Sequence, residues 1–401
     1  MGKLPQLSMQ SILTKNQVPA GEPFSEKGSL QISLKQETNK SLPANLVLIL
    51  DCSHSMRGEP MELFHVAIES VVQNLRPEDV LTVIPFGTYA EVLFKEKSSR
   101  DLESGFPYLK EMGATNYGAA FQAAIEMLTH ESSTRLLKGD DVHTVSKIAL
   151  FFTDGHPWKS EPWEELVPVF TQRGFSLNVL GMGTKIDYTK LEYISQISGG
   201  HYFHADSIQE LNDILMQILD FSQNVVFSLP KLEFTIYPDV AITSIDLVGP
   251  PRNLGKDFGP GNHEIVLPDL QSGSVLELLF DITMEIPGTA GQTQDLVEWN
   301  MINTPTEITR VHWVNQETAL LAPVSTRPAI LSKVYEGLDA IQRGDTIAAT
   351  QIATSLSKVS NNSVAQTGST IITRAASGGL SEGKLLALLS KTTTKRDGTL
   401  S

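Results

Sequence analysis

LVLILDCSHSMR, residues 46–57, is the stretch that decides the fold. The residues from Leu46 to Leu50 are all apolar, and Asp51 follows them directly. A continuous apolar run of this length is typical of a strand buried on both faces of a parallel sheet. Asp51 is followed by Ser53 and Ser55, so one carboxylate and two hydroxyls stand at alternating positions. Because open α/β sheets bind ligands at the carboxyl ends of their strands, this loop is the first candidate site.

Length and composition limit the class of protein. With 401 residues the chain is too long for one core, and two or three domains are expected. The formal net charge of −15 argues against general affinity for nucleic acid or anionic membranes, which attract basic patches. Cys52 is the only cysteine, so no disulfide can form within the chain, which fits a reducing compartment. No signal-peptide-like region and no run of roughly 18 apolar residues is present, so we expect a cytoplasmic protein without a transmembrane segment.

Residues 45–222 alternate between strand and helix patterns. Apolar residues spaced three and four apart from Met61 to Leu75 predict a helix directly after the first loop. Further strands are predicted at 80–84, 91–94, 147–152, 175–180 and 201–204. Further helices are predicted at 117–128, 161–172, 188–197 and 207–221. This alternation predicts a doubly wound, mostly parallel, Rossmann-like sheet.

The flanking regions carry a different pattern. Residues Leu30 to Lys35 alternate apolar and polar side chains, which predicts a half-buried antiparallel strand. Residues 224–322 contain short strand patterns separated by glycine and proline turns, which predicts a β-sandwich. The N-terminal strand needs a partner, and we expect it to pair with that sandwich. Residues 329–358 predict a helical hairpin broken at Gly344 and Asp345.

The expected organisation is therefore an α/β domain inserted in a β-sandwich and followed by a helical region. Residues 1–44 would supply the N-terminal strands of the sandwich, and residues 45–222 would form the α/β domain. Residues 223–323 would complete the sandwich. Residues 324–401 would hold the helical hairpin and a flexible C-terminal tail.

Two further loops carry oxygen donors, and we expect both at the same edge of the sheet as the first loop. Thr115 lies in the loop that precedes the predicted helix 117–128, and Asp154 follows the predicted strand 147–152. Carboxylate and hydroxyl oxygens suit a hard cation such as Mg²⁺, with Mn²⁺ or Ca²⁺ as alternatives. The sequence therefore predicts a metal site made of Asp51, Ser53, Ser55, Thr115 and Asp154.

The order Asp-x-Ser-x-Ser, then Thr, then Asp-Gly resembles the metal-ion-dependent adhesion site (MIDAS) of von Willebrand factor type A (VWA) domains. The resemblance covers residues 45–222. It implies that Ser53, Ser55 and Thr115 bind the ion directly, and that Asp51 and Asp154 act as outer-shell or switching ligands. An open position on the ion would then accept an Asp or Glu carboxylate of a protein partner.

The whole chain resembles prokaryotic VWA proteins of the Ca-activated chloride channel-like and inter-alpha-inhibitor heavy-chain-like group. The resemblance implies a metal-dependent protein-interaction module, a scaffold or regulatory subunit, rather than an enzyme. One alternative is an adaptor subunit for an AAA+ ATPase. Another is a metal-dependent hydrolase, although such a site would want a lysine and further carboxylates around the ion. The resemblance also implies a closing helix that shifts by one turn on partner binding, with a rigid binder as the alternative.

Other motifs carry less chemistry. The pair His201 and His204 has no third ligand at a useful spacing, so we interpret it as structural. Trp158 and Trp163 follow Asp154 closely. Each is interpreted either as a binding residue at the rim of the metal site or as a packed core residue. The stretch Gly378–Lys384 has the spacing of a P-loop, but Leu385 stands where that motif needs Ser or Thr, so no nucleotide site is expected there.

Overall fold

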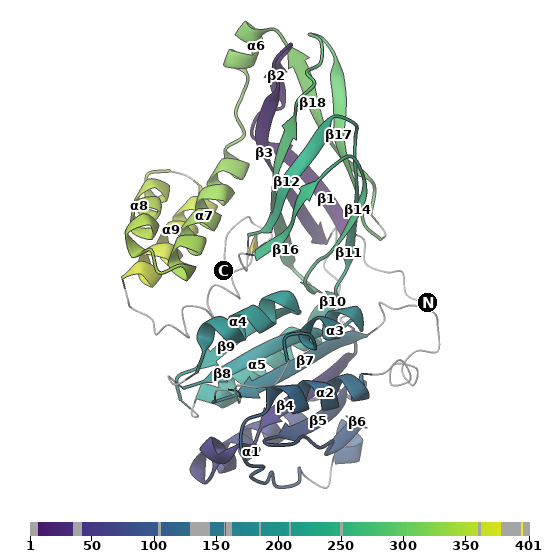
Figure 1. The fold of residues 1–401 in the computed structure, drawn as a ribbon, viewed down its shortest axis with the longest axis vertical. Helices are drawn as coiled ribbons and strands as arrows, with labels where there is room; N and C mark the ends of the chain where they lie inside the picture. Colours follow the sequence, from purple (N-terminus) through teal and green to yellow (C-terminus); the bar gives the residue numbers. More distant parts are fainter. Residues whose placement is uncertain are drawn as a thin grey trace.

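The structure is a computed structural model. It describes residues 7–34, 42–102, 106–128, 145–155, 157, 163–183, 186–207, 210–248, 252–302, 304–359, 362–377 and 394–395. Within these residues the chain forms an α/β domain, an elongated β-sandwich and a group of helices beside the sandwich (Figure 1). The predicted fold class is confirmed.

The α/β domain is built on one sheet with the strand order β6-β5-β4-β7-β8-β9. Its strands are β4 (Ala44–Asp51), β5 (Val80–Phe86), β6 (Phe94–Ser98), β7 (Ser146–Thr153), β8 (Ser176–Met182) and β9 (Gly199–Ala205). All neighbours are parallel except β6, which runs antiparallel to β5. Every residue of β4 is buried, as its continuous apolar run predicts, because helices cover both faces of the sheet.

Two groups of helices cover this sheet. The helices are α1 (Glu59–Gln73), α2 (Tyr117–Met127), α3 (Val167–Gln172), α4 (Tyr188–Ile197) and α5 (Leu211–Gln223), with short 3₁₀ turns η1 (His54–Met56) and η2 (Ser99–Leu102). The apolar residues of α2, α3 and α4 pack in one cluster with one face of the sheet. Those of α1 and α5 pack in another cluster with the opposite face.

Two predicted boundaries in this domain are wrong. The edge strand is β6 rather than residues 91–94. Phe94 is therefore the first residue of the strand and not its last, and its ring packs on Phe106. An edge strand with one exposed face does not need consecutive apolar residues. The third helix is also shorter than predicted and begins at Val167.

The β-sandwich combines strands from both sides of the α/β domain. One sheet has the order β1-β3-β16-β12-β13, and the other has the order β14-β11-β17-β18-β2. The first sheet contains β1 (Leu7–Leu13), β3 (Phe24–Leu34), β12 (Val240–Leu247), β13 (Arg252–Phe258), β16 (Ser274–Met284) and the short β19 (Thr394–Lys395). The second contains β2 (Gln17–Pro19), β11 (Lys231–Ile236), β14 (Gly261–Val266), β17 (Thr293–Asn300) and β18 (Glu307–Val314). β3 pairs with β16 and β2 pairs with β18, so the α/β domain is inserted in the sandwich.

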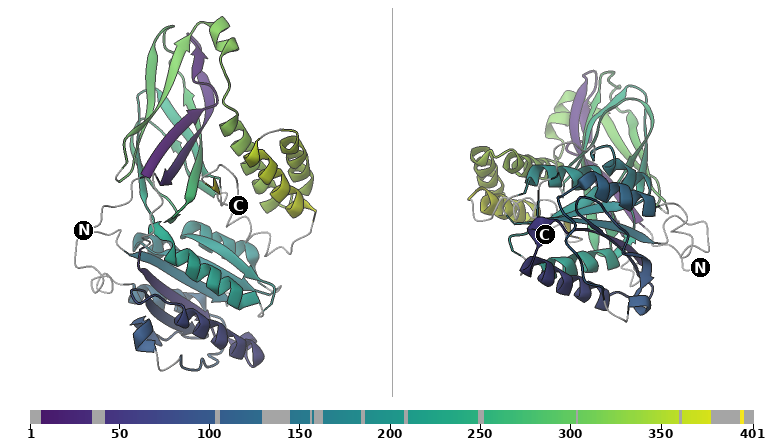
Figure 2. Two further views of the ribbon diagram at one scale, coloured as in Figure 1. Left: turned by 180° about the vertical axis from the view of Figure 1, so that it is seen from behind. Right: turned by 60° about the horizontal axis from the view of Figure 1, so that its bottom comes forward.

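The helical region follows the last sandwich strand. It contains α6 (Gln316–Leu321), α7 (Thr326–Gln342), α8 (Thr346–Ser357) and α9 (Ser363–Ala376). The predicted hairpin is α7 and α8, and Asp345 caps α8 by accepting a hydrogen bond from Ala348 N at 2.9 Å. Arg327 of α7 donates to Glu277 of β16 at 2.8 and 2.9 Å, which ties the helices to the side of the sandwich (Figure 2).

The junction between the two main domains fixes the direction of the parallel sheet. Leu42 N, just before β4, donates to Val225 O at 2.9 Å. Val225 begins the short strand β10 (Val225–Phe227), which pairs with β15 (Leu270–Gln271) of the sandwich region. The amino ends of the parallel strands therefore face the sandwich, and their carboxyl ends point away from it.

Candidate metal centre

Asp51 lies at the carboxyl end of β4 and is fully buried. Its Oδ1 accepts from Ser53 N at 2.9 Å, and its Oδ2 accepts from Thr153 Oγ1 at 2.6 Å. Burial raises the pKa of Asp51 to about 6, although the hydrogen bonds from Ser53 and Thr153 act in the opposite direction. A carboxylate in this position is poorly solvated, so a nearby cation would stabilise its ionised form.

Three loops meet here: the first carries Ser53 and Ser55, the second carries Thr115, and the third carries Asp154. The hydroxyls of the first loop connect Asp51 to the third loop. Ser53 Oγ and Ser55 Oγ lie 3.0 Å apart, and Ser55 Oγ donates to Asp154 Oδ1 at 2.7 Å. Burial also raises the pKa of Asp154. Hydrogen bonds therefore link four of the five predicted ligands in the order Asp51, Ser53, Ser55 and Asp154.

Thr115 approaches the same place from the second loop. A Cβ atom added to Gly155 would lie 3.1 Å from Thr115 Oγ1 and 4.0 Å from Ser55 Oγ, so Thr115 stands against the third loop on the side of Ser55. The backbone holds the first two loops together, since His54 N donates to Gly113 O at 2.8 Å and Met112 N donates to Cys52 O at 2.7 Å. The structure therefore brings all five predicted residues to one edge of the sheet.

Two residues that the sequence analysis did not single out support this arrangement. Thr153 Oγ1 donates to Asp51 and also accepts from Gly155 N at 3.2 Å, so one hydroxyl connects the first and third loops. Tyr117, buried at the start of α2, donates its hydroxyl to Gly155 O at 2.9 Å. Burial raises the pKa of this hydroxyl, so it stays protonated and can donate. In the sequence, Thr153 directly precedes the predicted ligand Asp154, and Tyr117 begins the predicted helix that follows Thr115. No other sequence signal marked these two residues.

The donor set fits a small, hard cation. Ser53 Oγ and Ser55 Oγ share a hydrogen bond of 3.0 Å, and adjacent oxygens around an octahedral Mg²⁺ with bonds of about 2.1 Å have the same separation, so both hydroxyls can turn to one ion without moving apart. The predicted ligands carry hydroxyls and carboxylates, the groups that Mg²⁺, Mn²⁺ and Ca²⁺ prefer. Cys52 is buried next to the loop, and burial raises the pKa of its thiol to about 12, so it offers no thiolate.

We call the carboxyl edge of the α/β sheet, where the five predicted ligands lie, the metal edge. Its surroundings are exposed on the side of the loops that carry Ser55 and Thr115. The side chain of His54 is 71% exposed and pairs with Glu111, which also lies 3.7 Å from Arg57 Nε. Tyr89, in the turn after β5, is 57% exposed. Thr88, next to it, accepts from Ala114 N at 2.9 Å through its Oγ1, which places this turn beside the second loop. A partner that reaches the metal edge would meet these side chains.

Other candidates from the sequence have structural roles or fall outside the described residues. His201 packs on Phe221, and His204 is buried with its Nδ1 3.1 Å from the Tyr202 hydroxyl. In the part of the chain that the structure describes, no three His, Cys, Asp or Glu side chains gather as a metal site. Trp163 is a core residue packed against Tyr117. Trp158 and Gly378–Lys384 lie outside the described residues.

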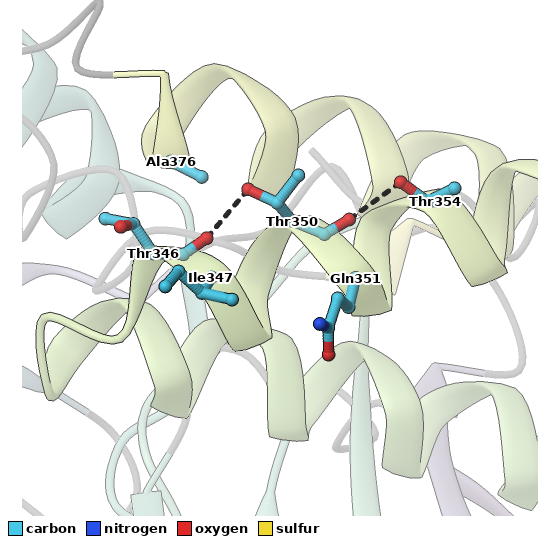
Figure 3. A pocket seen from close by; sticks show the side chains of 6 residues that line it. All are labelled: Thr346, Ile347, Thr350, Gln351, Thr354 and Ala376. Atoms are coloured by element: carbon cyan, nitrogen blue, oxygen red, sulfur yellow. Dashed lines mark hydrogen bonds between the residues drawn. The ribbon is translucent and has the colours of Figure 1, made fainter.

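A hollow of about 490 Å³ lies on the helical region, between α8 and the end of α9. Figure 3 shows its lining residues, which are Thr346, Ile347, Thr350, Gln351, Thr354 and Ala376. The hydroxyls of Thr350 and Thr354 donate to backbone carbonyls one turn earlier, at 2.7 and 2.8 Å, and are therefore already used within α8. The hollow offers the amide of Gln351, the hydroxyl of Thr346 and no charge, so it has no chemistry comparable to the metal edge.

Comparison with known proteins agrees with the sequence motif. A protein-family model, von Willebrand factor type A domain, matches residues 45–217. Inter-alpha-trypsin inhibitor heavy chain H2 of Homo sapiens is 27% identical over 267 residues, which cover 64% of this chain and 26% of that protein. Heavy chain H4 of Sus scrofa is 26% identical over 233 residues, which cover 54% of this chain and 24% of that protein. The chain thus spans about a quarter of the length of these relatives.

A relative of similar length comes from a bacterium. The uncharacterized protein sll0103 of Synechocystis sp. is 24% identical over 312 residues, which cover 72% of this chain and 70% of that protein. Among solved structures, the von Willebrand factor type A protein from Catenulispora acidiphila superposes with a TM-score of 0.71 at 15% identity, over 99% of this chain and 92% of that chain. The ArnB paralog VWA2 from Sulfolobus acidocaldarius gives a TM-score of 0.63 at 13% identity, over 96% and 97%. At these identities the structural likeness shows the fold alone.

Proposed function

Because residues 45–217 are a von Willebrand factor type A domain, we propose that this chain is a metal-dependent protein-interaction module that acts as a scaffold or regulatory subunit. Domains of this family commonly mediate protein–protein interaction and bind a divalent metal at the MIDAS. The observation that carries the proposal is the meeting of three oxygen-bearing loops at the carboxyl edge of the sheet. This edge points away from the sandwich, and His54 and Ser55 of its first loop are exposed to a partner.

The proposed ion is Mg²⁺, with Mn²⁺ or Ca²⁺ as alternatives. Ser53, Ser55 and Thr115 would hold it directly, and Asp51 and Asp154 would act through water. When bound, the ion supplies a positive charge that neutral hydroxyls leave largely uncompensated, so it attracts an anionic ligand. Thr153 and Tyr117 orient the loops that carry these ligands, which reduces the ordering that binding requires.

The proposed partner is a protein that supplies an Asp or Glu carboxylate. A carboxylate bound to an incompletely neutralised cation in a partly dried interface forms a strong charge-assisted contact. This activity needs no turnover, and the relatives in this family are mainly non-enzymatic interaction modules. An adaptor role toward an AAA+ ATPase is one form that such recognition could take, whereas hydrolysis would need groups that the three loops do not supply.

A cytoplasmic location is part of this proposal. Cys52 is a free, buried thiol, which fits a reducing compartment. Among the described residues, no helix is both long and apolar enough to cross a membrane. Fractionation of cells that express the chain would test the location directly.

Calorimetric titration with Mg²⁺ and Mn²⁺ tests the metal site. The double variant Ser53→Ala/Ser55→Ala should lose binding, because it removes two proposed direct ligands. It should keep its fold, because alanine retains the backbone hydrogen bond from residue 53 to Asp51. The double variant Thr350→Ala/Thr354→Ala is the matched control, since it removes two hydroxyls from the hollow on α8. Unchanged affinity in the first variant would refute the site. Pull-down in Mg²⁺ against EDTA, followed by mass spectrometry, would then identify metal-dependent partners.

A further inference from the structure

The last turn of α5 is bonded on both of its sides. Toward the sandwich, Phe221 O accepts from Gln271 Nε2 at 3.2 Å, and Asn224 O accepts from Ser272 N at 3.1 Å. These contacts accompany the pairing of β10 with β15 immediately after the helix. The carboxyl end of α5 is therefore fixed to the segment that enters the sandwich.

Toward the α/β domain, the same turn is held by an ion pair. Gln223 O accepts from Arg76 Nη1 at 3.2 Å, and Gln223 Nε2 donates to Asp79 Oδ2 at 2.9 Å. Arg76 and Asp79 lie 2.8 Å apart, and Asp79 is fully buried. Asp79 Oδ1 also accepts from Ala44 N at 2.8 Å, so one carboxylate connects the start of β4 to the end of α5.

A second buried carboxylate crosses the junction. Asp269, just before β15, accepts from Ser176 Oγ of β8 at 2.9 Å. It also accepts from Ser228 Oγ at 3.0 Å and Leu229 N at 2.8 Å, both in the segment after β10. Asp269 is 8% exposed, so each of these donors compensates for the loss of water. One donor comes from the α/β domain and two come from the connection after β10, whereas the acceptor Asp269 belongs to the sandwich region.

An arginine of the sandwich completes the contact. Arg252, the first residue of β13, donates from Nη1 to Gln196 O at 2.6 Å, at the carboxyl end of α4. The last turn of α4 has no basic residue of its own. A cation at this end of a helix is favourable, because the unpaired carbonyls carry partial negative charge. Arg252 therefore supplies from one domain the charge that a helix of the other domain lacks.

We propose that the α/β domain and the sandwich move as one body, joined by the junction clamp Arg76, Asp79, Arg252 and Asp269. Within this clamp, Arg76 and Asp79 hold α5 in a single axial position, and Arg252 and Asp269 join the two domains directly. A one-turn shift of α5, by about 5.4 Å, would break its contacts with Arg76, Asp79, Gln271 and Ser272 together. Occupancy of the metal edge is therefore not passed to the sandwich by a sliding helix. The sandwich serves as a rigid base that presents the metal edge at its far end. This inference goes beyond the proposed function and does not depend on it.

Distance measurements between spin labels test the clamp. The native Cys52 is buried, so labels will attach to introduced cysteines. Val66→Cys on α1 paired with Asn212→Cys on α5 reports the position of the helix, and Val66→Cys paired with Glu233→Cys on β11 reports the domain arrangement. All three positions are exposed. Each pair is measured without metal, with Mg²⁺, and with Mg²⁺ plus acetate as the smallest carboxylate.

We expect both distances to stay constant in all three conditions. A shift of about 5 Å in the Val66–Asn212 distance on addition of Mg²⁺ or acetate would overturn the proposal. In the double variant Asp269→Ala/Arg252→Met, the Val66–Glu233 distribution should become roughly twofold broader, since relative motion is the default for domains without a tight interface. An unchanged width would also overturn it.

Two additions keep the result clear. Lys256→Ala, on the same strand as Arg252 and exposed, is the control and should leave the width unchanged. If the double variant does not fold, Asp269→Asn alone removes one charge while keeping the volume, and it should broaden the distribution to a smaller extent. If calorimetry shows that Mg²⁺ does not bind, the proposed function fails, whereas the comparison of widths without metal still decides the clamp.

Discussion

Replacing Thr153 by valine tests how the metal site is positioned. Valine has nearly the same shape as threonine but no hydroxyl, so the variant removes the 2.6 Å hydrogen bond to Asp51 Oδ2 and the 3.2 Å hydrogen bond from Gly155 N. Thr153 itself is fully buried, so water cannot replace the lost donor. The change leaves every proposed metal ligand in the chain and alters only what holds two of the loops.

The magnitude follows from the hydrogen bonds that are lost. A hydrogen bond to a charged group contributes about 1.5–3 kcal/mol. Loss of such a partner to a ligand-bearing group typically weakens metal binding by about 10- to 100-fold, which corresponds to about 1.4–2.8 kcal/mol. We therefore expect the Kd for Mg²⁺ and Mn²⁺ to rise by about 10- to 100-fold in Thr153→Val.

Calorimetric titration measures this change, and Thr153→Ser is its control because it keeps the hydroxyl. The serine variant should bind within a few-fold of the unaltered chain. Urea unfolding without metal separates the effect on the fold from the effect on the ion, and unfolding with Mg²⁺ shows how much stabilisation by the ion remains. If the valine and serine variants bind Mn²⁺ equally well, Thr153 does not position the site and this reasoning is wrong.

Four other predictions concern residues around the site and the core. Tyr117→Phe removes the hydrogen bond to Gly155 O and should weaken Mn²⁺ binding by about 0.5–1.5 kcal/mol in the same titration, with equal binding as the contrary result. Gly155→Ala places a Cβ atom 3.1 Å from Thr115 Oγ1, so it should lower the affinity for the ion while urea unfolding without metal changes little. Asp269 has a folded pKa of about 6, raised by burial above the 3.8 of the exposed group, so its contribution to stability is present below pH 3.8 and is lost as the pH rises through about 6. Between pH 4 and pH 7 the free energy of unfolding in urea should therefore fall by up to about 3 kcal/mol more in the unaltered chain than in Asp269→Asn, whereas Asp51, whose pKa is also about 6, contributes equally to both. Parallel pH profiles would contradict this. Ile32→Ala in β3 should destabilise the sandwich by about 2–5 kcal/mol and speed hydrogen exchange in residues 274–284, the strand that pairs with it, and unaltered exchange there would contradict the pairing as a source of stability.

Local patterns were sufficient for the buried sheet and its closing helix. The run from Leu46 to Leu50 forms the fully buried β4, and the spacing of apolar residues from Leu211 to Leu219 forms the buried face of α5. The same kind of pattern located the hairpin of α7 and α8, which turns at Gly344 and Asp345 as predicted. These features could be predicted because burial and capping impose a period or a residue type on neighbouring positions.

Several strands escaped prediction because their pattern is weak. No strand was predicted at the positions of β1, β2, β13, β17 and β18, and residues 91–94 were mistaken for the edge strand that begins at Phe94. β13 exposes much of its length and lies at the edge of its sheet, so its burial does not impose a regular alternation. The pairing of N-terminal strands with strands more than 200 residues later could be expected in outline only, because register depends on partners that the local sequence does not name.

The sequence by itself determined which oxygen donors this protein has and that they follow buried strands, because the composition of the loops and the runs before them are local properties. Only the tertiary structure decided how the donors meet. The approach of Thr115 to the third loop, the bond from Thr153 to Asp51 and the hydroxyl of Tyr117 beneath Gly155 join residues from different strands and helices. The junction clamp was likewise invisible, since Asp269 and Ser176 are separated by 93 residues. Hydrogen bonds between distant residues leave no period in the sequence, and they form only where packing brings donor and acceptor within reach and removes the water between them.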